Sequence, residues 1–578
     1  MSTSDDLVLS LCDEVWKWRL KESPEMASYC GIHEYDDLWD DISAEAYTRR
    51  EKCVQDFLAK AVAIDISSCS DKVALSLTLL IYDLQSYLKG SKFKSYLMPI
   101  NYLEGIHNDC NHIISYMNFK TKEDFQKYIR RLENLPQRIA QVEEALRQGV
   151  REEIVQHSAS VARVPGQLDE LIHIPLESHE LLKPFTQAPE SISKNDLDKF
   201  RSKAEELLTS QVFPAFQKLK NYVENEYFLH LRPNEGISSI KDGDQWYQQC
   251  LDYHLSCSMT PQQIHDVGLK EVARIEELIL KLAEAEGLGQ TLQDILAGIK
   301  IRQKNILTTK DEVLEFVRNL CYNKIRPKIS LLFKDLPDIP VSIKPAPDFM
   351  KNAPAGFYYN GTPDGSRSGC YYINNHNPED CLPFVLPALS LHEGEPGHHL
   401  QGVYTLAASD LPDFQRYSED CKFYLPPGKF AFHTAFSEGW GLYSEFLGEE
   451  LKIYDNKFDQ IGRYSFEIFR AVRLVVDTGI HAFGWSKEKA VQYMETHTLK
   501  SKNEVTNEID RYITWPGQAC AYKIGELKIK ELREKAQVAL GTKFDMKEFH
   551  QCVLSCGSVP LQVLESLVDK FIDDIQKH

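Results

Sequence analysis

The segment His392–His399, with the sequence HEGEPGHH, constrains this chain most because it concentrates groups that bind a metal ion. Neutral imidazole is a preferred zinc ligand, and a neighbouring glutamate can take a proton from metal-bound water. Zinc peptidases usually carry His-Glu-x-x-His on one helix, which places both histidines on the same face. Here Pro396 stands where the second histidine would fall. A metal site therefore requires an interruption of the helix.

The spacing shows why an unbroken helix cannot bring two of these histidines to one ion. His398 would lie roughly 9 Å along the helix from His392 on another side, and His399 would lie roughly 10.5 Å away on the same side. Pro396 removes an N–H group and Gly397 reaches unusual backbone angles, so together they can bulge the chain. We predict His392 and His398 as ligands, with His399 lining the site or replacing His398. The alternative is a helix that ends at Pro-Gly and leaves surface histidines.

A second segment is predicted to supply a third ligand from a helix over residues 429–451. Its apolar residues recur every three or four positions, as in an amphipathic helix. Glu438 lies on this helix, and Glu445 lies two turns later on the same face. Glycines close to Glu438 indicate close packing, because glycine otherwise weakens a helix interior. In gluzincin peptidases a glutamate from a later helix binds zinc, so we predict Glu438 as ligand and Glu445 as its neighbour. The alternative is two solvated carboxylates.

Two later segments are predicted to complete the site. Arg473, Asp477 and His481 follow at intervals of four and share one face of an otherwise apolar helix. A polar row on such a helix must be paired or face a cavity, and an internal salt bridge between Arg473 and Asp477 is the alternative to a cavity. The segment around Trp515-Pro516-Gly517 carries the polar residues Arg511, Tyr512, Gln518 and Tyr522.

These motifs resemble the domain-of-unknown-function 885 family. The matching stretches are HExxPGHHLQ from His392, EGWxLY from Glu438, RLVVDTGIH from Arg473 and WPGQAxAY from Trp515. The resemblance runs from Gly31 to Leu561 and so covers nearly the whole chain. Family members are similar in plan to helical zinc peptidases such as thermostable carboxypeptidase and angiotensin-converting enzyme.

The resemblance implies a mainly α, gluzincin-like metallopeptidase fold with a deep cleft that admits short peptides and excludes folded proteins. It also implies that a tyrosine and a histidine near the metal donate hydrogen bonds to the developing oxyanion, and Tyr522 and His481 are the candidates. By the same resemblance Arg511 would hold a substrate carboxylate. We add Arg473, Tyr512 and Gln518 as substrate-binding candidates.

Periodicity predicts a helix-rich chain. Apolar residues recur every three to four positions over residues 5–30, 41–65, 72–89, 121–148, 195–226, 243–256 and 261–286. Thr260 is the predicted N-cap of the last of these helices, with Pro261 at its first position. Another helix is expected from Lys310 onward.

The composition changes near Leu336 and becomes rich in Pro, Gly, Asn and Tyr as far as Asn377. Short strands are predicted there at Val341–Lys344, Gly356–Tyr359 and Cys370–Ile373. We therefore predict a helical lobe, residues 1–335, that forms one wall of the cleft, and a catalytic lobe, residues 336–578. The catalytic lobe would carry a small antiparallel sheet next to the metal-binding helix, whose edge could pair with an extended peptide. The alternative is an irregular connector.

Composition is that of a large globular protein with an acidic surface. The chain has 578 residues, 43% hydrophobic, and a formal net charge of −19, which disfavours nucleic acid and anionic membranes as partners. No stretch approaches the roughly 20 apolar residues of a membrane span. The first residues lack the basic region of a signal peptide, and the 14 cysteines are scattered singly. We therefore expect reduced thiols and a cytoplasmic location.

We predict a zinc-dependent peptidase that hydrolyses short peptides, as a monomer or homodimer. His392, His398 and Glu438 would bind Zn²⁺, and Glu393 would act as general base toward the metal-bound water. Two alternatives remain. One is a metal-dependent amidohydrolase that uses the same residues on non-peptide amides, and the other is a non-catalytic peptide-binding scaffold. The presence of Glu393 argues against the scaffold.

Overall fold

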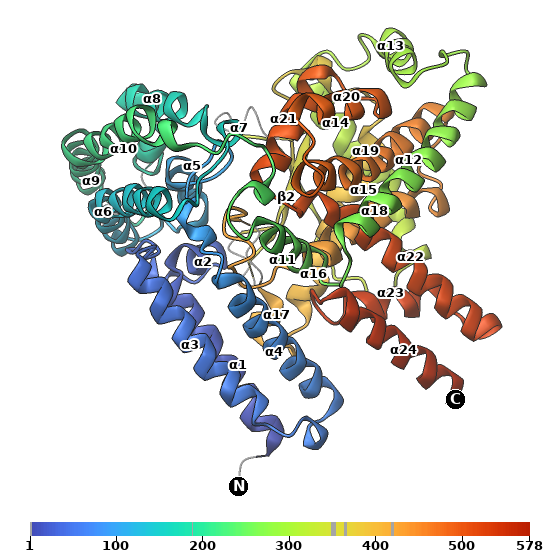
Figure 1. The fold of residues 1–578 in the computed structure, drawn as a ribbon, viewed down its shortest axis with the longest axis horizontal. Coiled ribbons are helices and arrows are strands. Elements are labelled where there is room, and N and C mark those ends of the chain that lie inside the picture. The colour runs from blue at the N-terminus through green and yellow to red at the C-terminus, as the bar shows by residue number, and fades with distance from the viewer. Residues whose placement is uncertain (1–2, 188, 348–353, 363–366, 418–420, 578) are drawn as a thin grey trace. The chain divides into compact units, whose positions relative to one another are not determined.

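The computed structural model describes residues 3–187, 189–347, 354–362, 367–417 and 421–577, and it consists mainly of helices (Figure 1). The chain folds into two compact units, each assembled from several stretches of sequence. The first unit comprises Met1–Gln249, Leu411–Ala431 and Ile513–Trp515, and the second comprises Cys250–Asp410, Phe432–Tyr512 and Pro516–His578. The boundary predicted at 335/336 falls inside the second unit.

Three helices at the start of the first unit pack side by side (Figure 1). They are α1 (Ser4–Glu22), α3 (Ala44–Val62) and α4 (Asp71–Ser91). The predicted helix over residues 5–30 divides after α1, and Pro24 begins the short helix α2 (Pro24–Tyr29). Proline fits this position because the first residue of a helix has no intrahelical partner for its N–H group.

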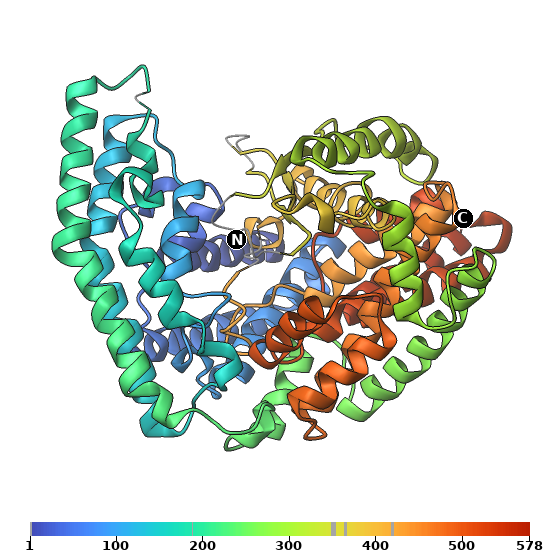
Figure 2. The same ribbon diagram turned by 90° about the horizontal axis from the view of Figure 1, so that it is seen from above.

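The rest of the first unit is a second group of helices with a core of its own. Its elements are α5 (Ile106–His112), α6 (Lys122–Glu152), α7 (Ser158–Val161), α8 (Val164–His173), α9 (Lys194–Leu207) and α10 (Phe213–Asn225). The short helix α17 (Asp413–Arg416) packs instead on α1. The predicted helix over residues 195–226 is α9 and α10, joined by a π-helical turn into one nearly continuous rod, coloured teal to green in Figure 2. Phe125, Leu132 and Phe216 are fully buried in the core between these helices.

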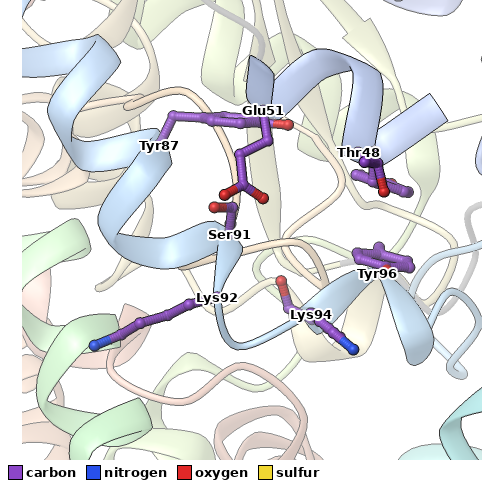
Figure 3. A pocket seen from close by; sticks show the side chains of 10 residues that line it. Thr48, Glu51, Tyr87, Ser91, Lys92, Lys94 and Tyr96 are labelled. Atoms are coloured by element: carbon purple, nitrogen blue, oxygen red, sulfur yellow. The ribbon is translucent and has the colours of Figure 1, made fainter. Parts of the chain in front are cut away.

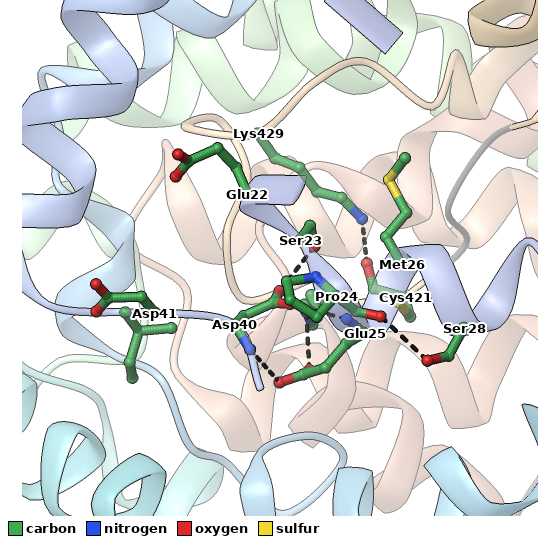
Figure 4. Close-up of polar contacts among 12 residues, drawn as sticks. Glu22, Ser23, Pro24, Glu25, Met26, Ser28, Asp40, Asp41, Cys421 and Lys429 are labelled. Atoms are coloured by element: carbon green, nitrogen blue, oxygen red, sulfur yellow. Dashed lines mark hydrogen bonds and ion pairs between the residues drawn. The ribbon is translucent and has the colours of Figure 1, made fainter. Parts of the chain in front are cut away.

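Two buried carboxylates of the first unit, those of Glu25 and Asp40, are tied together by hydrogen bonds (Figure 4). Lys422 Nζ lies 2.9 Å from Glu25 Oε2 and also contacts Asp40. Asp40 accepts hydrogen bonds from Ser23 Oγ at 2.8 Å and from the N–H group of Glu25 at 3.0 Å. Burial would raise the pKa of Asp40, but the charge of Lys422 outweighs it and lowers this pKa to about 2. The group is a self-contained ion cluster.

A small polar pocket lies in the first unit between α3, α4 and the segment that follows α4 (Figure 3). The rings of Tyr47 and Tyr96 stack at 3.8 Å on its wall. Thr48 Oγ1 donates to the carbonyl oxygen of Ala44, and Ser91 Oγ donates to that of Leu88. These two hydroxyl groups therefore already have acceptors in the protein.

The second unit is built on two long helix pairs. The helix α12 (Pro261–Glu284) packs along α19 (Lys457–His481), and α18 (Thr434–Glu450) packs along α22 (Ala521–Leu540). Glycines permit both approaches, since a side-chain carbon at Gly268 would lie 2.7 Å from Val475 and one at Gly439 would lie 2.4 Å from Gly525. Thr260 caps α12 as predicted.

The remaining α-helices are α13 (Leu292–Gln303), α14 (Lys310–Asn319), α15 (Leu386–Glu393), α16 (His398–Ala407), α20 (Lys487–His497), α23 (Met546–Leu554) and α24 (Leu561–Lys577). Two further helices, α11 (Gly243–Leu255) and α21 (Lys502–Thr514), contribute residues to both units.

A three-stranded sheet of the second unit precedes α15 in the sequence. Its strands are β1 (Ser342–Pro345), β2 (Gly356–Tyr359) and β3 (Cys370–Ile373), in the order β1-β3-β2. The predicted strands are confirmed within one residue. The sheet is mixed and not wholly antiparallel, because β2 pairs antiparallel with β3 whereas β1 pairs parallel with it. Two reversals of the chain separate β1 from β3, so these two strands run in the same direction.

Candidate metal centre

The interrupted motif forms two helices joined by a turn. The helix α15 ends at Glu393, and α16 begins at His398. A side-chain carbon at Gly397 would lie 1.9 Å from the carbonyl oxygen of His392, so only glycine fits where the turn passes this close to the preceding helix. The expected bulge within one helix is therefore a complete break, which returns His398 to a position beside His392.

Two contacts from other elements hold this turn. Trp440 of α18 is fully buried, and its Nε1 donates to the carbonyl oxygen of Pro396 at 2.8 Å. Arg326 forms an ion pair with Glu395, which is 4% exposed. The turn is thus fixed by tertiary contacts in addition to the conformational limits of Pro396.

Three potential ligand atoms converge where the two helices meet α18. Glu438 Oε2 lies 3.4 Å from His392 Nε2 and 3.5 Å from His398 Nε2. Zinc–nitrogen and zinc–oxygen bonds of about 2.0–2.1 Å in a tetrahedron place neighbouring ligand atoms roughly 3.3 Å apart. The observed separations match this value, and they exceed the 2.7–2.9 Å typical of charge-assisted hydrogen bonds. Within the described residues, this trio is the only cluster of His, Cys, Asp or Glu arranged to hold a metal ion.

The electrostatics of the trio favour a bound cation. Burial would lower the pKa of His392, but Glu438 and Glu445 outweigh it and raise this pKa to about 9. Burial would raise the pKa of Glu438, but His392 and His398 hold it well below its usual range. The carboxylate is therefore charged, and protons and a metal ion would compete for the same imidazole nitrogen.

A second carboxylate orients the first imidazole. Glu445 Oε1 lies 2.9 Å from His392 Nδ1, so this nitrogen carries a proton, and in the neutral imidazole that a metal would bind, the Nε2 lone pair faces Glu438 and His398. Arg470 Nη2 lies 3.3 Å from the same oxygen of Glu445. A side-chain carbon at Gly441 would lie 2.6 Å from the His392 ring, so glycine makes room for the imidazole on α18.

The other motif residues take different places. Glu393 follows His392 at the end of α15 and is 7% exposed; burial raises the pKa of its carboxyl group. His399 points elsewhere, because its Nδ1 lies 3.1 Å from Tyr358 Oη and its Nε2 lies 2.8 Å from the carbonyl oxygen of Ile339. Burial lowers the pKa of His399 to about 4, so this ring is neutral. The geometry thus favours His398 over His399 as the ligand.

Tyr522 borders the trio. Its ring lies 6.5 Å from the ring of His392, with an angle of 18° between the two planes. The Arg473 guanidinium lies 4.4 Å from the centre of the Tyr522 ring. Burial raises the pKa of the Tyr522 hydroxyl, and the nearby Glu438 carboxylate raises it further, so the group remains a proton donor.

The predicted substrate-binding residues form a network around Glu508 of α21. Arg473, Arg511 and Tyr512 all contact Glu508 Oε2, at 3.2, 2.8 and 2.6 Å. Arg511 Nη1 donates to Gln518 Oε1 at 3.1 Å. Gln518 thereby joins this network and connects it to the tyrosine beside the trio. Polar groups of all the predicted residues are thus engaged within the protein.

His481 and Asp477 do not join the trio. His481 is fully buried, with Nε2 2.9 Å from the carbonyl oxygen of Tyr512, and Asp477 accepts a hydrogen bond from the N–H group of Gly517 at 3.1 Å. Arg473, Asp477 and His481 share a helical face, but they are spread over roughly 12 Å of α19 and so meet different neighbours. The predicted catalytic role of His481 is not supported by this geometry.

Sequence reasoning missed several residues that shape the centre, and only some left a signal. Glu508 lies three residues before Arg511 and four before Tyr512, the spacings at which helical side chains meet. Arg470 lies one helical turn before Arg473 and could have been found in the same way. Trp440 and Arg326 act on the turn from distant parts of the sequence, and no local pattern indicates those contacts.

Comparisons with known proteins cover nearly the full length. The family described as "Bacterial protein of unknown function (DUF885)" matches residues 24–568. A crystal structure described as "the putative lipoprotein from Colwellia psychrerythraea" is 26% identical with a TM-score of 0.92, covering 99% of this chain and 100% of that one. A structure described as "a putative lipoprotein of unknown function from Shewanella oneidensis" is 18% identical with a TM-score of 0.70, covering 98% and 100%. No match was found among curated proteins.

These descriptions contradict the cytoplasmic location predicted from the sequence. Lipoproteins are attached to membranes by lipid chains, so relatives described in this way point away from the cytoplasm. The prediction rested on scattered cysteines and on the residues after Met1, and neither feature determines a compartment. Across the described residues, no helix is long and apolar enough to cross a membrane.

Proposed function

The chain belongs to the DUF885 family, and from this premise we propose that it is a zinc-dependent peptidase acting on short peptides. One observation carries the proposal: Glu438 Oε2 lies 3.4 Å from His392 Nε2 and 3.5 Å from His398 Nε2, separations expected of neighbouring ligand atoms in a zinc tetrahedron, and all three atoms lie within 4.8 Å of one another. Three protein ligands leave a fourth position for water or substrate, as in catalytic zinc sites. We also propose the deep cleft that the family resemblance implies.

The side chains around the trio supply the remaining chemistry. A zinc ion held there would lower the pKa of water and polarise a carbonyl group. Glu393 lies near enough to His392, His398 and Glu438 for their charges to act on its carboxyl group, so this carboxylate can take a proton from water and later give it to the leaving amine. The Tyr522 ring borders His392 and its hydroxyl feels the charge of Glu438, so this hydroxyl can donate a hydrogen bond to the oxyanion that develops on the scissile carbonyl.

Replacing the general base tests the proposal most directly. In Glu393→Gln we expect peptide hydrolysis to fall by at least about 100-fold, because glutamine cannot accept the proton. Zinc content should stay stoichiometric, since Glu393 is not among the three ligands. Cleavage would be measured by mass spectrometry on a peptide library and zinc by elemental analysis, with the exposed Glu379→Gln as control.

The same experiment separates the competing functions. Turnover of small N-acyl compounds without cleavage of any peptide would favour an amidohydrolase. A protein that binds no zinc and cleaves nothing would favour a peptide-binding scaffold. Loss of zinc from Glu393→Gln would place Glu393 among the ligands and overturn the assignment of the base.

A further inference from the structure

Glu508 anchors the hydrogen-bond network that leads to Tyr522. Its Oε2 accepts from Arg511 Nη2 at 2.8 Å and from Tyr512 Oη at 2.6 Å, and it pairs with Arg473 Nη2 at 3.2 Å. Burial would raise the pKa of Glu508, but Arg511 and Arg473 hold it far below its usual range. The carboxylate therefore stays charged and fixes the position of the Arg511 guanidinium.

Arg511 determines which way the Gln518 amide faces. The oxygen and nitrogen of a glutamine amide can be assigned only from their partners. Arginine offers donors and no acceptor, so the atom of Gln518 that lies 3.1 Å from Arg511 Nη1 must be the oxygen. The amide nitrogen of Gln518 consequently faces the other way, toward Tyr522.

The Gln518 amide in turn determines where the Tyr522 proton points. Gln518 Nε2 lies 3.4 Å from Tyr522 Oη and can only donate. A phenol oxygen carries one proton, and that proton cannot point at another donor. The hydroxyl proton must therefore point away from Gln518, and the Tyr522 ring borders His392 of the metal trio.

Arg473 fixes the plane of the same ring. Its guanidinium lies between two aromatic rings, 4.4 Å from the centre of Tyr522 and 4.3 Å from that of Phe469. Its Nε donates to Tyr512 Oη at 2.9 Å. Tyr522 is thus held through its ring by Arg473 and through its oxygen by Gln518.

We propose that Gln518 is a positioning residue that, oriented by Arg511 and Glu508, aims the Tyr522 hydroxyl proton at the metal-bound substrate carbonyl. This inference rests on the proposed peptidase function. It also reassigns Arg511, Tyr512 and Gln518 from contacts with the substrate to an internal relay that ends at the oxyanion donor.

Gln518→Glu reverses the last hydrogen bond and so tests the relay. The new carboxylate accepts from Arg511 as before, but it also accepts the Tyr522 proton and turns it away from the metal. Loss of one oxyanion donor costs about 100- to 1,000-fold in kcat. We expect kcat to fall about 100-fold with KM changed less than about threefold and zinc content unchanged. Gln537→Glu, an exposed site on α22, is the matched control.

A double-mutant cycle separates the relay from a merely structural role. If Gln518 acts only through the Tyr522 hydroxyl, Gln518→Glu should change kcat less than about twofold in a Tyr522→Phe background. Gln518→Met removes the amide without adding charge; if Gln518→Glu does not fold, this variant replaces it in the cycle, with an expected loss of about 10-fold. Multiplicative losses in the double variant would overturn the relay while leaving the peptidase proposal intact.

Binding of acetohydroxamate to the zinc-loaded protein gives a second readout that does not depend on hydrolysis. Calorimetry should show about 10-fold weaker binding in Gln518→Glu and in Tyr522→Phe, and no further loss when the two are combined. A parent protein that shows this pattern but cleaves no peptide would refute the peptidase and support the relay. Additive losses in this assay would refute the relay, and a parent that retains no zinc would refute both.

Discussion

Two buried polar clusters in the second unit differ in what lies at their centres. Lys523 Nζ lies 2.7 Å from Glu467, 2.6 Å from Glu526 and 3.0 Å from Glu271, so one ammonium group meets three carboxylates. In the metal trio, by contrast, the three facing atoms are two imidazole nitrogens and one carboxylate oxygen, which offer lone pairs. A cluster with its own cation is complete as a structural ion network, whereas a cluster of converging lone pairs fits a cation from solution.

The charge states within the Lys523 cluster support this contrast. Burial would lower the pKa of Lys523, but the surrounding glutamates outweigh it and hold the pKa above its ordinary value. Burial would raise the pKa of Glu467, but Lys523 and Arg463 hold it well below its ordinary value. These ions are charged because they have partners within the protein, so the Lys523 cluster should respond to mutation and not to metal chelators.

The largest expected effect follows removal of the cation from the Lys523 cluster. Lys523→Met leaves buried carboxylates without their main partner, and breaking a buried ion pair in this way costs about 3–5 kcal/mol. Urea unfolding should show this loss equally with and without a chelator. The exposed Lys300→Met is the matched control. A loss below about 1 kcal/mol would show that Arg274, Arg463 and Lys530 suffice to balance the glutamates.

The stability difference between the parent and Lys523→Met should depend on pH. The lowered pKa of Glu467 gives a stabilisation that is fully present above the unfolded value near 4.5 and is lost as pH falls toward the folded value. The raised pKa of Lys523 gives a second stabilisation, which is present below the unfolded pKa near 10.4 and is lost at higher pH. The difference in stability between parent and Lys523→Met should therefore be largest between about pH 5 and 10 and should shrink in acid.

Bound zinc should stabilise the folded protein by a smaller amount. A ligand at 100 times its Kd raises the free energy of unfolding by about 2.7 kcal/mol. Calorimetric melting with zinc and with chelator should show this increment in the parent and in Lys523→Met, provided that variant is folded. The increment should be absent in Glu438→Ala. Equal zinc stabilisation of Glu438→Ala and the parent would remove Glu438 from the site.

Changing the carboxylate behind His392 should have a more modest effect. Replacing a residue that orients a metal ligand typically costs 10–100-fold in metal affinity. We expect Glu445→Ala to weaken zinc binding by about this factor, and Glu445→Gln to weaken it less, because its amide oxygen can still accept from His392 Nδ1. Competition with a zinc chelator measures the affinity, and Glu450→Gln on the same helix is the control.

The smallest effect is expected at the proline that interrupts the motif. Trp440 and Arg326 also hold the turn, so Pro396→Ala should lower zinc affinity less than about threefold. Trp440→Phe removes the hydrogen bond to the Pro396 carbonyl oxygen while keeping an aromatic ring, and it should cost more than the proline substitution. The reverse order of the two effects would mean that the proline itself maintains the break.

The contrast between the clusters also explains what could be predicted from the sequence. The trio was predictable because His392 and His398 lie close together in the chain and Glu438 lies on a strongly patterned helix. The Lys523 cluster joins α12, α19 and α22, and its individual glutamates resemble surface residues in the sequence. Helices were found from periodicity and strands from local composition and turn residues, but the parallel pairing of β1 was not found, because neither signal gives strand direction.

Sequence patterns could not predict the division into two units, for a related reason. Leu411–Ala431 and Ile513–Trp515 belong to the first unit although they are embedded in segments of the second. Their composition carries no sign of membership in the first unit, and only their distant contacts place them there. The same limit applied to His481, whose helical face was predicted but whose neighbour, the Tyr512 carbonyl, was not.

The placement of Leu411–Ala431 has a consequence for synthesis of the chain. Asp40 leaves the ribosome 382 residues ahead of Lys422, the lysine that neutralises it in the folded first unit. At about 5–20 residues per second, this interval lasts roughly 20–80 s. During that time Asp40 lacks the lysine that pairs with it in the folded unit, and burying this carboxylate without its cation is costly. The first unit to be translated is therefore completed only after Cys250–Asp410 of the second unit have been made.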